Sequence, residues 1–351
     1  MIHGGNIFYY ANKIKCHPKE ILDFSANINP LDIPDEIIKK IKENINNLSF
    51  YPDPDYSELK NKIALYHQIS SGFIVCGNGA SELIFALSRV IKNKNILIPV
   101  PTFLEYTRHF EKNNNLIKYQ LKERNFKIEA DFAEHINKDI HAVIICNPNN
   151  PTSNLIQKEY LIKIFEKCKK YNTMLIIDEC FLDFCPDAYS FVNNINDEVS
   201  IVIIKSFTKM FSIPGLRLGY LITNNQSVLQ NIKENIPEWN VNALAEKAGI
   251  AITEDYQHIL KSVKYINEQK KELSQELNEM KFNILGQDAN FIFFSSTNKI
   301  NEEKLMKKHK ILIRNCENFS LCDNYYYRIA IKKKQDNIKL INAFKKIHCG
   351  E

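Results

Sequence analysis

The stretch that decides the fold is Lys205–Tyr220, KSFTKMFSIPGLRLGY, which follows a short apolar run typical of a buried strand. A lysine in a partly desolvated loop can act as an amine nucleophile and form a Schiff base, and Lys209 has this position. Ser206 and Thr208 offer hydroxyls nearby, and Arg217 offers a planar fork for a phosphate. A lysine on a solvated loop, the alternative, would not explain these neighbours.

Around this stretch, short apolar runs alternate with helical patterns from about residue 70 to 225. Such runs are typical of strands buried on both faces, and the alternation predicts a parallel sheet with helices outside it. The fold class is therefore α/β. The expected strands are 73–75, 95–98 (ended by Pro99), 142–146, 174–177, 200–204 and 218–222, and the expected helices include 31–46, 56–68, 81–90, 106–113 and 158–170.

The pattern changes toward the C-terminus, where one long helix is expected from about 245 to 282. Short strands at 291–294 and 326–331 and a final helix follow, which indicates a smaller α+β domain. We expect an N-terminal segment, 1–45, that packs with the small domain, a large α/β domain, 46–240, and the small domain, 241–351.

Composition excludes several classes of function. The net charge of +5 is too small and too scattered along the 351 residues to predict nucleic-acid binding. The nine cysteines form no CxxC pair and no Cys/His cluster with zinc spacing, so we predict neither a metal site nor a disulfide framework. The first residues lack the pattern of a signal peptide, and no apolar run of about 18 residues predicts a membrane span. We expect a cytoplasmic protein.

Polar clusters follow the expected strands at their carboxyl ends, where open α/β sheets bind ligands. Gly77-Asn78-Gly79 precedes a helix that begins near Ala80 and Ser81, an arrangement that suits an anion but also a plain connection. Asn150 lies in the rigid loop NPNNPT, 147–152, which could equally be a surface turn.

A carboxylate follows the strand 174–177. A buried Asp178 would be costly unless it is paired, and a protonated ring nitrogen is a suitable partner. A helix cap or a surface acid is the alternative. Arg314 and Arg328 stand at the edges of later apolar runs and suit the binding of anionic groups, with surface salt bridges as the alternative.

In chain order, Asn150, Asp178, Lys209, Arg217 and Arg328 resemble the cofactor and carboxylate positions of the fold-type-I pyridoxal-phosphate enzymes, the aspartate aminotransferase superfamily. The resemblance covers nearly the whole chain. Its nearest branches are the histidinol-phosphate aminotransferases and the threonine-phosphate decarboxylases of cobalamin synthesis. The segments similar to the second branch are HGGNI (3–7), DFSANINP (23–30), IPGLRLGY (213–220), WNVNALA (239–245) and ILIRNC (311–316), of which the first two discriminate between the branches.

The resemblance implies a role for each matching residue. Lys209 would hold pyridoxal 5'-phosphate and return a proton to Cα, Asp178 would pair with the pyridine nitrogen, and Asn150 would bond the 3-hydroxyl. The other implied cofactor contacts are Phe103 on the ring and Ala80, Ser81, Ser206, Thr208, Arg217 and a neighbouring subunit's Tyr51 at the phosphate, so a homodimer with shared sites is implied. The implied substrate contacts are His3, Asn27 and Arg314 for a phosphate, Arg328 for a carboxylate, and Gly4 and Asn150.

Three positions depart from the superfamily pattern. Ser153 replaces a usual glycine, Cys180 replaces a usual alanine, and Phe181 stands where many aminotransferases have a tyrosine that bonds the cofactor. The loss of that hydroxyl favours a reaction other than transamination.

The resemblance implies decarboxylation of L-threonine O-3-phosphate, with L-serine O-phosphate as a close variant, because one methyl group discriminates only weakly. An aminotransferase acting on histidinol phosphate with 2-oxoglutarate is the alternative. A non-catalytic domain of a transcription regulator is a third hypothesis. Such a protein would need an attached DNA-binding domain, and the presence of Lys209 argues against it. The sequence leaves open which bond at Cα breaks.

Overall fold

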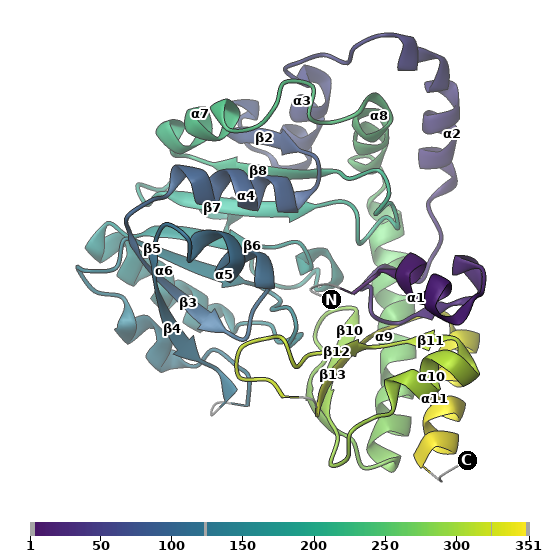
Figure 1. Ribbon diagram of the computed structural model, residues 1–351. Helices are drawn as coiled ribbons and strands as arrows, with labels where there is room; N and C mark the ends of the chain where they lie inside the picture. The colour runs from purple at the N-terminus through teal and green to yellow at the C-terminus, as the bar shows by residue number, and fades with distance from the viewer. Residues whose placement is uncertain (1–3, 123–124, 324, 349–351) are drawn as a thin grey trace.

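The computed structural model describes residues 4–122, 125–323 and 325–348. Its largest sheet has seven strands in the order β2-β8-β7-β6-β5-β3-β4 (Figure 1). These strands are β2 (Ile74–Gly77), β3 (Asn95–Val100), β4 (Asn115–Gln120), β5 (Ala142–Cys146), β6 (Met174–Asp178), β7 (Ile201–Ser206) and β8 (Gly219–Thr223). The fold is the expected α/β fold.

Helices cover both faces of this sheet because alternate strand residues point to opposite sides. In β5, Ile144 packs in a cluster with α4, α5 and α7, whereas Val143 and Ile145 pack in the cluster that contains α3, α6 and α8. The helices are α3 (Ser57–His67), α4 (Ala80–Val90), α5 (Leu104–Phe110), α6 (Lys158–Tyr171), α7 (Gln226–Glu234) and α8 (Ala243–Ile252).

The sheet is mixed, which corrects the expectation of a purely parallel one. The strand β8 runs antiparallel to both β2 and β7. Its connection from β7 contains no α-helix, and a parallel return would need a crossover, usually helical. The edge strand β4 was not predicted, because its residues are mostly exposed or half-buried and form no continuous apolar run.

The strand β3 continues through Pro99 to Val100, so the prediction that Pro99 ends it was wrong. The carbonyl of Val100 accepts from the amide of Leu121 on the β4 side. The backbone of Pro99 therefore faces β5, with which β3 pairs only at Ile96 and Leu97. A proline costs no ladder hydrogen bond there.

A second unit contains a four-stranded antiparallel sheet in the order β12-β13-β10-β9, and β1 pairs in parallel with β11 beside it. The pairing of β1 with β11 and the contact of α1 with α10 place the N-terminal segment against this unit (Figure 1). The elements are β1 (Leu22–Asp23), β9 (Asn283–Gly286), β10 (Phe291–Ser295), β11 (Ile311–Leu312), β12 (Arg314–Asn315), β13 (Tyr326–Ala330), α1 (Ile7–Ile14), α9 (Tyr256–Glu279), α10 (Glu302–His309) and α11 (Lys334–His348). The helix α2 (Asp35–Glu43) packs instead against α8.

The single helix expected from 245 to 282 is two helices, α8 and α9. The helix α8 ends at Ile252, and Asp255 caps α9 by accepting a hydrogen bond from the amide of His258. The helix α8 packs against α2 and α3, whereas α9 runs along β9, β10 and α11. Across the described ranges, no helix is both long and apolar enough to cross a membrane.

Candidate active site

The carboxylate of Asp178 lies at the end of β6, with only 4% of the residue exposed. Its Oδ1 accepts the backbone N–H of Cys180 at 2.7 Å, and its Oδ2 accepts the hydroxyl of Tyr106 from α5. Burial, and then the nearby carboxylate, raises the pKa of Tyr106 well above its usual value. The phenol is therefore a neutral, permanent donor to Asp178.

Lys209 follows β7 and is half-buried. Its Nζ lies 5.0 Å from the centre of the Phe181 ring, and in the described part of the chain it forms no ion pair. Its backbone carbonyl accepts the amide of Asn29 at 3.0 Å. The amine therefore meets an apolar ring rather than a counter-ion, which suits a nucleophile.

A cradle for an anion lies where β2 meets α4. Gly79 has φ +79°, and a side chain added there would collide with the guanidinium of Arg217. Arg217 therefore lies directly at the N-terminus of α4, which begins at Ala80 and continues with Ser81. Unpaired N–H groups and a guanidinium at one point attract a phosphate.

Two hydroxyls belong to the loop after β7 that faces this cradle. Ser206 Oγ and Thr208 Oγ1 lie 2.7 Å apart and share a hydrogen bond, and both residues are buried. Gly219 of β8 allows the close approach, because a Cβ there would lie 2.6 Å from the amide nitrogen of Ala80. The predicted phosphate-binding residues of α4, β7 and the loop between β7 and β8 thus meet.

The guanidinium of Arg328, in β13, reaches the Asn150 loop. Its Nη1 donates to Asn150 Oδ1, and its Nη2 donates to the carbonyl of Ser25 at 2.6 Å. Its Nε is buried without a hydrogen-bond partner, and burial lowers the pKa of Arg328 to about 10. Within the described ranges no carboxylate pairs with it, so an anion would complete its bonding.

Arg314 is the direct cross-strand partner of Arg328 in the β12–β13 pair. It lines a cavity of about 180 Å³ with Gly4, Ser25, Glu302 and other residues of both ends of the chain. Its Nη2 donates to Asn318 Oδ1 at 2.7 Å, and burial lowers its pKa. The two arginines thus share one face of the small sheet.

The remaining predicted residues have varied positions. The Oδ1 of Asn27 is buried without a hydrogen-bond partner. Phe103 meets Tyr106 edge to face at 5.8 Å, and Tyr51 is 81% exposed and lies against Trp239 at 4.9 Å. His3 lies outside the described residues.

The sequence did not indicate Tyr106, because a tyrosine at an apolar helical position is typical of a core residue. It did mark Ser153 as unusual. The Oγ of Ser153 donates to the carbonyl of Phe291 at 2.8 Å and accepts the amide of Ala289 at 3.1 Å. The loop that contains Asn150 is thereby joined to the small sheet.

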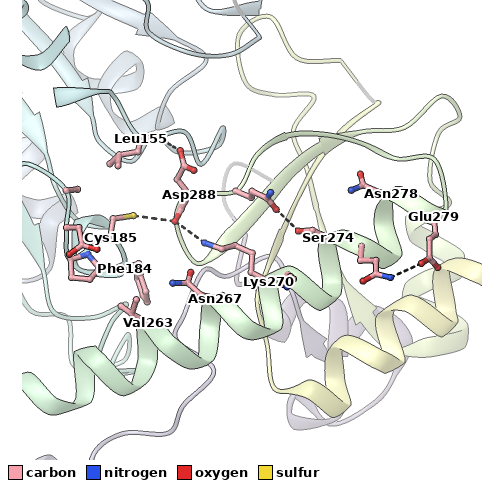
Figure 2. Close-up of a pocket in the computed structure, with 16 residues that line it drawn as sticks. Leu155, Phe184, Cys185, Val263, Asn267, Lys270, Ser274, Asn278, Glu279 and Asp288 are labelled. Carbon is pink, nitrogen blue, oxygen red and sulfur yellow. Dashed lines mark hydrogen bonds between the residues drawn. The ribbon is translucent and has the colours of Figure 1, made fainter. Parts of the chain in front are cut away.

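A cavity of about 1030 Å³ lies between α9 and the segment Phe184–Ala188 (Figure 2). Asp288 joins its walls: Oδ2 accepts the amide of Leu155, and the backbone carbonyl accepts Lys270 Nζ and Cys185 Sγ. Its described lining contains no predicted site residue.

The residues at the strand ends fit a phosphorylated pyridine aldehyde. The cradle at Gly79 and Arg217 suits its phosphate, Asp178 suits a protonated ring nitrogen, and Lys209 is the amine that would bond its carbonyl carbon.

Comparison with known proteins gives relatives of two kinds. The threonine-phosphate decarboxylase of Salmonella typhimurium is 32% identical over 352 residues, which is 99% of this chain and 97% of that protein. The histidinol-phosphate aminotransferase of Christiangramia forsetii is 32% identical over 96% of this chain and 92% of that protein. The crystal structure of the histidinol-phosphate aminotransferase from Clostridium acetobutylicum is 37% identical, with a TM-score of 0.86 over 94% of this chain and 100% of that one.

These relatives confirm the fold-type-I architecture, pyridoxal phosphate as the cofactor, and the resemblance to threonine-phosphate decarboxylases. Residues 19–344 match the Aminotransferase class I and II family, and the chain therefore belongs to this family of pyridoxal-phosphate enzymes.

Proposed function

We propose that this enzyme decarboxylates L-threonine O-3-phosphate to (R)-1-amino-2-propanol O-2-phosphate and CO2, a step of cobalamin biosynthesis, with L-serine O-phosphate as a poorer substrate. One observation is central: Arg314 and Arg328 are direct partners in β12 and β13, and both are buried. Like charges directly opposite one another are destabilising, so an anion bound beside them is favoured. A substrate with two anionic groups on neighbouring carbons would place one beside each guanidinium.

Threonine phosphate has such groups: a carboxylate on Cα and a phosphate on the Cβ oxygen. Arg328, with its unpartnered Nε, would bind the carboxylate. Arg314, in the cavity with Gly4, would bind the phosphate together with His3 and Asn27. Histidinol phosphate has a phosphate but no carboxylate, so it would neutralise only one arginine.

The cofactor residues follow from the same proposal. When bound, pyridoxal phosphate supplies a ring that accepts the electron pair left by the broken bond at Cα. Asp178 would pair with the ring nitrogen and keep its proton there, Asn150 would bond the 3-hydroxyl, and Phe103 would stack on the ring. The proposed phosphate ligands are Ala80, Ser81, Ser206, Thr208 and Arg217.

The choice of bond depends on how the substrate is turned. Two anchors, at Arg314 and Arg328, would fix the rotation about Cα and thereby select the bond to the carboxylate rather than the bond to hydrogen. Lys209 Nζ would then give a proton to Cα after the loss of CO2. Phe181 lies 5% exposed beside this amine and would exclude water from it.

A homodimer is part of the proposal. Tyr51 and Phe50 are 81% and 73% exposed, and they lie on the large unit together with Trp239. Exposed aromatic patches of this kind are typical of interaction surfaces. We expect a second copy to cover them, with Tyr51 reaching the cofactor phosphate of that copy.

The second candidate is a histidinol-phosphate-type aminotransferase, favoured by the 37% identity to the Clostridium acetobutylicum structure. One experiment separates the two. The cofactor-loaded enzyme is incubated with threonine phosphate and no oxo acid, and released CO2 is measured beside a Lys209→Ala control. Steady CO2 release that the control lacks supports the decarboxylase. Absence of CO2 combined with amino transfer from histidinol phosphate to 2-oxoglutarate would replace it with the aminotransferase.

A further inference from the structure

Tyr106 is fixed on two sides at the centre of the site. It is 1% exposed, its hydroxyl donates to Asp178 Oδ2, and its ring meets Phe103 edge to face. It therefore contacts both the carboxylate and the aromatic ring that are proposed to hold the cofactor. No role has so far been given to its hydroxyl.

Two hydrogen-bond donors contact the carboxylate of Asp178. The Cys180 N–H and the Tyr106 O–H both donate to it. The thiols of Cys146 and Cys180 are close by, and burial, followed by the charge of Asp178, raises the pKa of each well above its usual value. Both thiols are therefore neutral. The charge of Lys209 acts in the opposite direction and lowers the pKa of both thiols by a smaller amount.

We propose that Tyr106 is a positioning residue that keeps the proton of the cofactor's ring nitrogen on the ring, by donating its own proton to Asp178. This inference rests on the proposed pairing of Asp178 with that nitrogen. A hydrogen bond to a carboxylate stabilises its charged form. While Asp178 stays charged, the proton between it and the ring remains on nitrogen, where it makes the ring an electron acceptor.

Removing the hydroxyl moves that proton. Without the Tyr106 donor the carboxylate holds a proton more tightly, so the shared proton shifts from the ring nitrogen toward Asp178. The ring then accepts the electron pair less readily. The substitution Tyr106→Phe removes only this hydroxyl, since the ring that contacts Phe103 remains.

The chain offers a matched control. Tyr119 is also buried, and its hydroxyl donates to a carboxylate, Asp131 Oδ1, at 2.6 Å, but it lies on the edge strand β4. Tyr119→Phe removes the same kind of bond away from the site. Asp178→Asn serves as the positive control, because an amide cannot hold the proton on the ring.

The experiment uses enzyme loaded with pyridoxal phosphate that is ¹⁵N-labelled in the ring, with no substrate present. The ¹⁵N chemical shift reports the protonation of that nitrogen directly. We expect the Tyr106→Phe resonance to move toward the unprotonated position, in the direction set by Asp178→Asn, while Tyr119→Phe matches wild type. In turnover of the enzyme's substrate, kcat should fall by about tenfold or more with little change in KM.

A Tyr106→Phe resonance at the wild-type position, with Asp178→Asn shifted, would overturn the inference. An unshifted Asp178→Asn resonance would instead refute the pairing on which it rests. Neither result depends on which phosphorylated substrate is used, so failure here is distinct from failure of the CO2 assay.

Discussion

The hydroxyl of Ser153 donates to the carbonyl of Phe291 at 2.8 Å, which joins the loop that contains Asn150 to β10 of the small sheet. The same oxygen accepts the amide of Ala289, and Asp288 N donates to the Ser153 carbonyl. These bonds keep Asn150 and Arg328 in a fixed relative position, although Asn150 belongs to the large unit and Arg328 to the small one. Ser153 has φ +61°, so its backbone conformation is one that glycine would adopt more easily.

We expect Ser153→Ala to lower the free energy of unfolding by about 1–3 kcal/mol, because it leaves a buried amide and carbonyl without the hydroxyl. Ser153→Gly should cost less, because glycine relieves the positive φ. Urea unfolding measures both, with Ser49→Ala as control, since Ser49 is exposed and bonds only the Asn46 carbonyl. Equal stability of Ser153→Ala and wild type would show that these bonds do not support the loop.

The positions of Asp178 and Lys209 at strand ends could be predicted from the sequence, because buried parallel strands appear as apolar runs whose ends are visible. Asp178 directly follows the run 174–177, and Lys209 lies in the loop that follows the run 201–204. The contacts of Tyr106 and Ser153 could not be predicted. They depend on residues more than 70 positions away in the chain, and no local pattern encodes which buried side chain meets which.

The orientation of β8 and the break between α8 and α9 were also not predicted, because the local sequence pattern does not encode them. An apolar run does not reveal strand direction, and the sequence of β8 resembles that of the parallel strands β5 and β6. The break at Asp255 depends on one capping side chain within a continuous helical pattern. Such a pattern hides a short interruption.

Gly79→Ala should weaken cofactor binding by tenfold or more. A methyl group there would collide with the Arg217 guanidinium, and the φ of +79° is strained for alanine. Titration of the apoenzyme with pyridoxal phosphate, followed by absorbance, measures this. Gly215→Ala is the matched control, since a Cβ at Gly215 meets nothing within 4 Å. Equal weakening in both variants would contradict the cradle.

Arg328→Lys should raise KM for threonine phosphate by about 10–100-fold. The planar guanidinium of Arg328 donates to Asn150 and Ser25 and would bind the substrate carboxylate at the same time, which a lysine cannot do. Steady-state kinetics test this. Arg108→Lys is the control, since Arg108 forms a half-exposed pair with Glu105. If Arg328→Lys leaves KM unchanged while Arg314→Lys raises it, Arg328 does not bind the carboxylate.

We expect His67 to make the enzyme sensitive to acid. It is half-buried, and its Nε2 shares a hydrogen bond with Tyr220 at 2.7 Å. Burial, followed by the charge of Lys205, lowers its pKa to about 3. In the unfolded chain a histidine has a pKa of about 6.5. Between pH 6.5 and 3 the unfolded state therefore binds one more proton at this site than the folded state does.

Stability accordingly falls as pH drops through this window, by up to about 1.4 kcal/mol per pH unit from this residue, and His67 contributes no such dependence above pH 7. His67→Gln keeps a hydrogen-bonding group near Tyr220 but cannot be protonated. We expect urea unfolding at pH 7 and pH 5 to differ less in His67→Gln than in wild type. His135→Gln, at an exposed histidine, should retain the wild-type difference. The same acid sensitivity in all three proteins would mean that His67 takes up its proton without unfolding, so that the lowered pKa is incorrect.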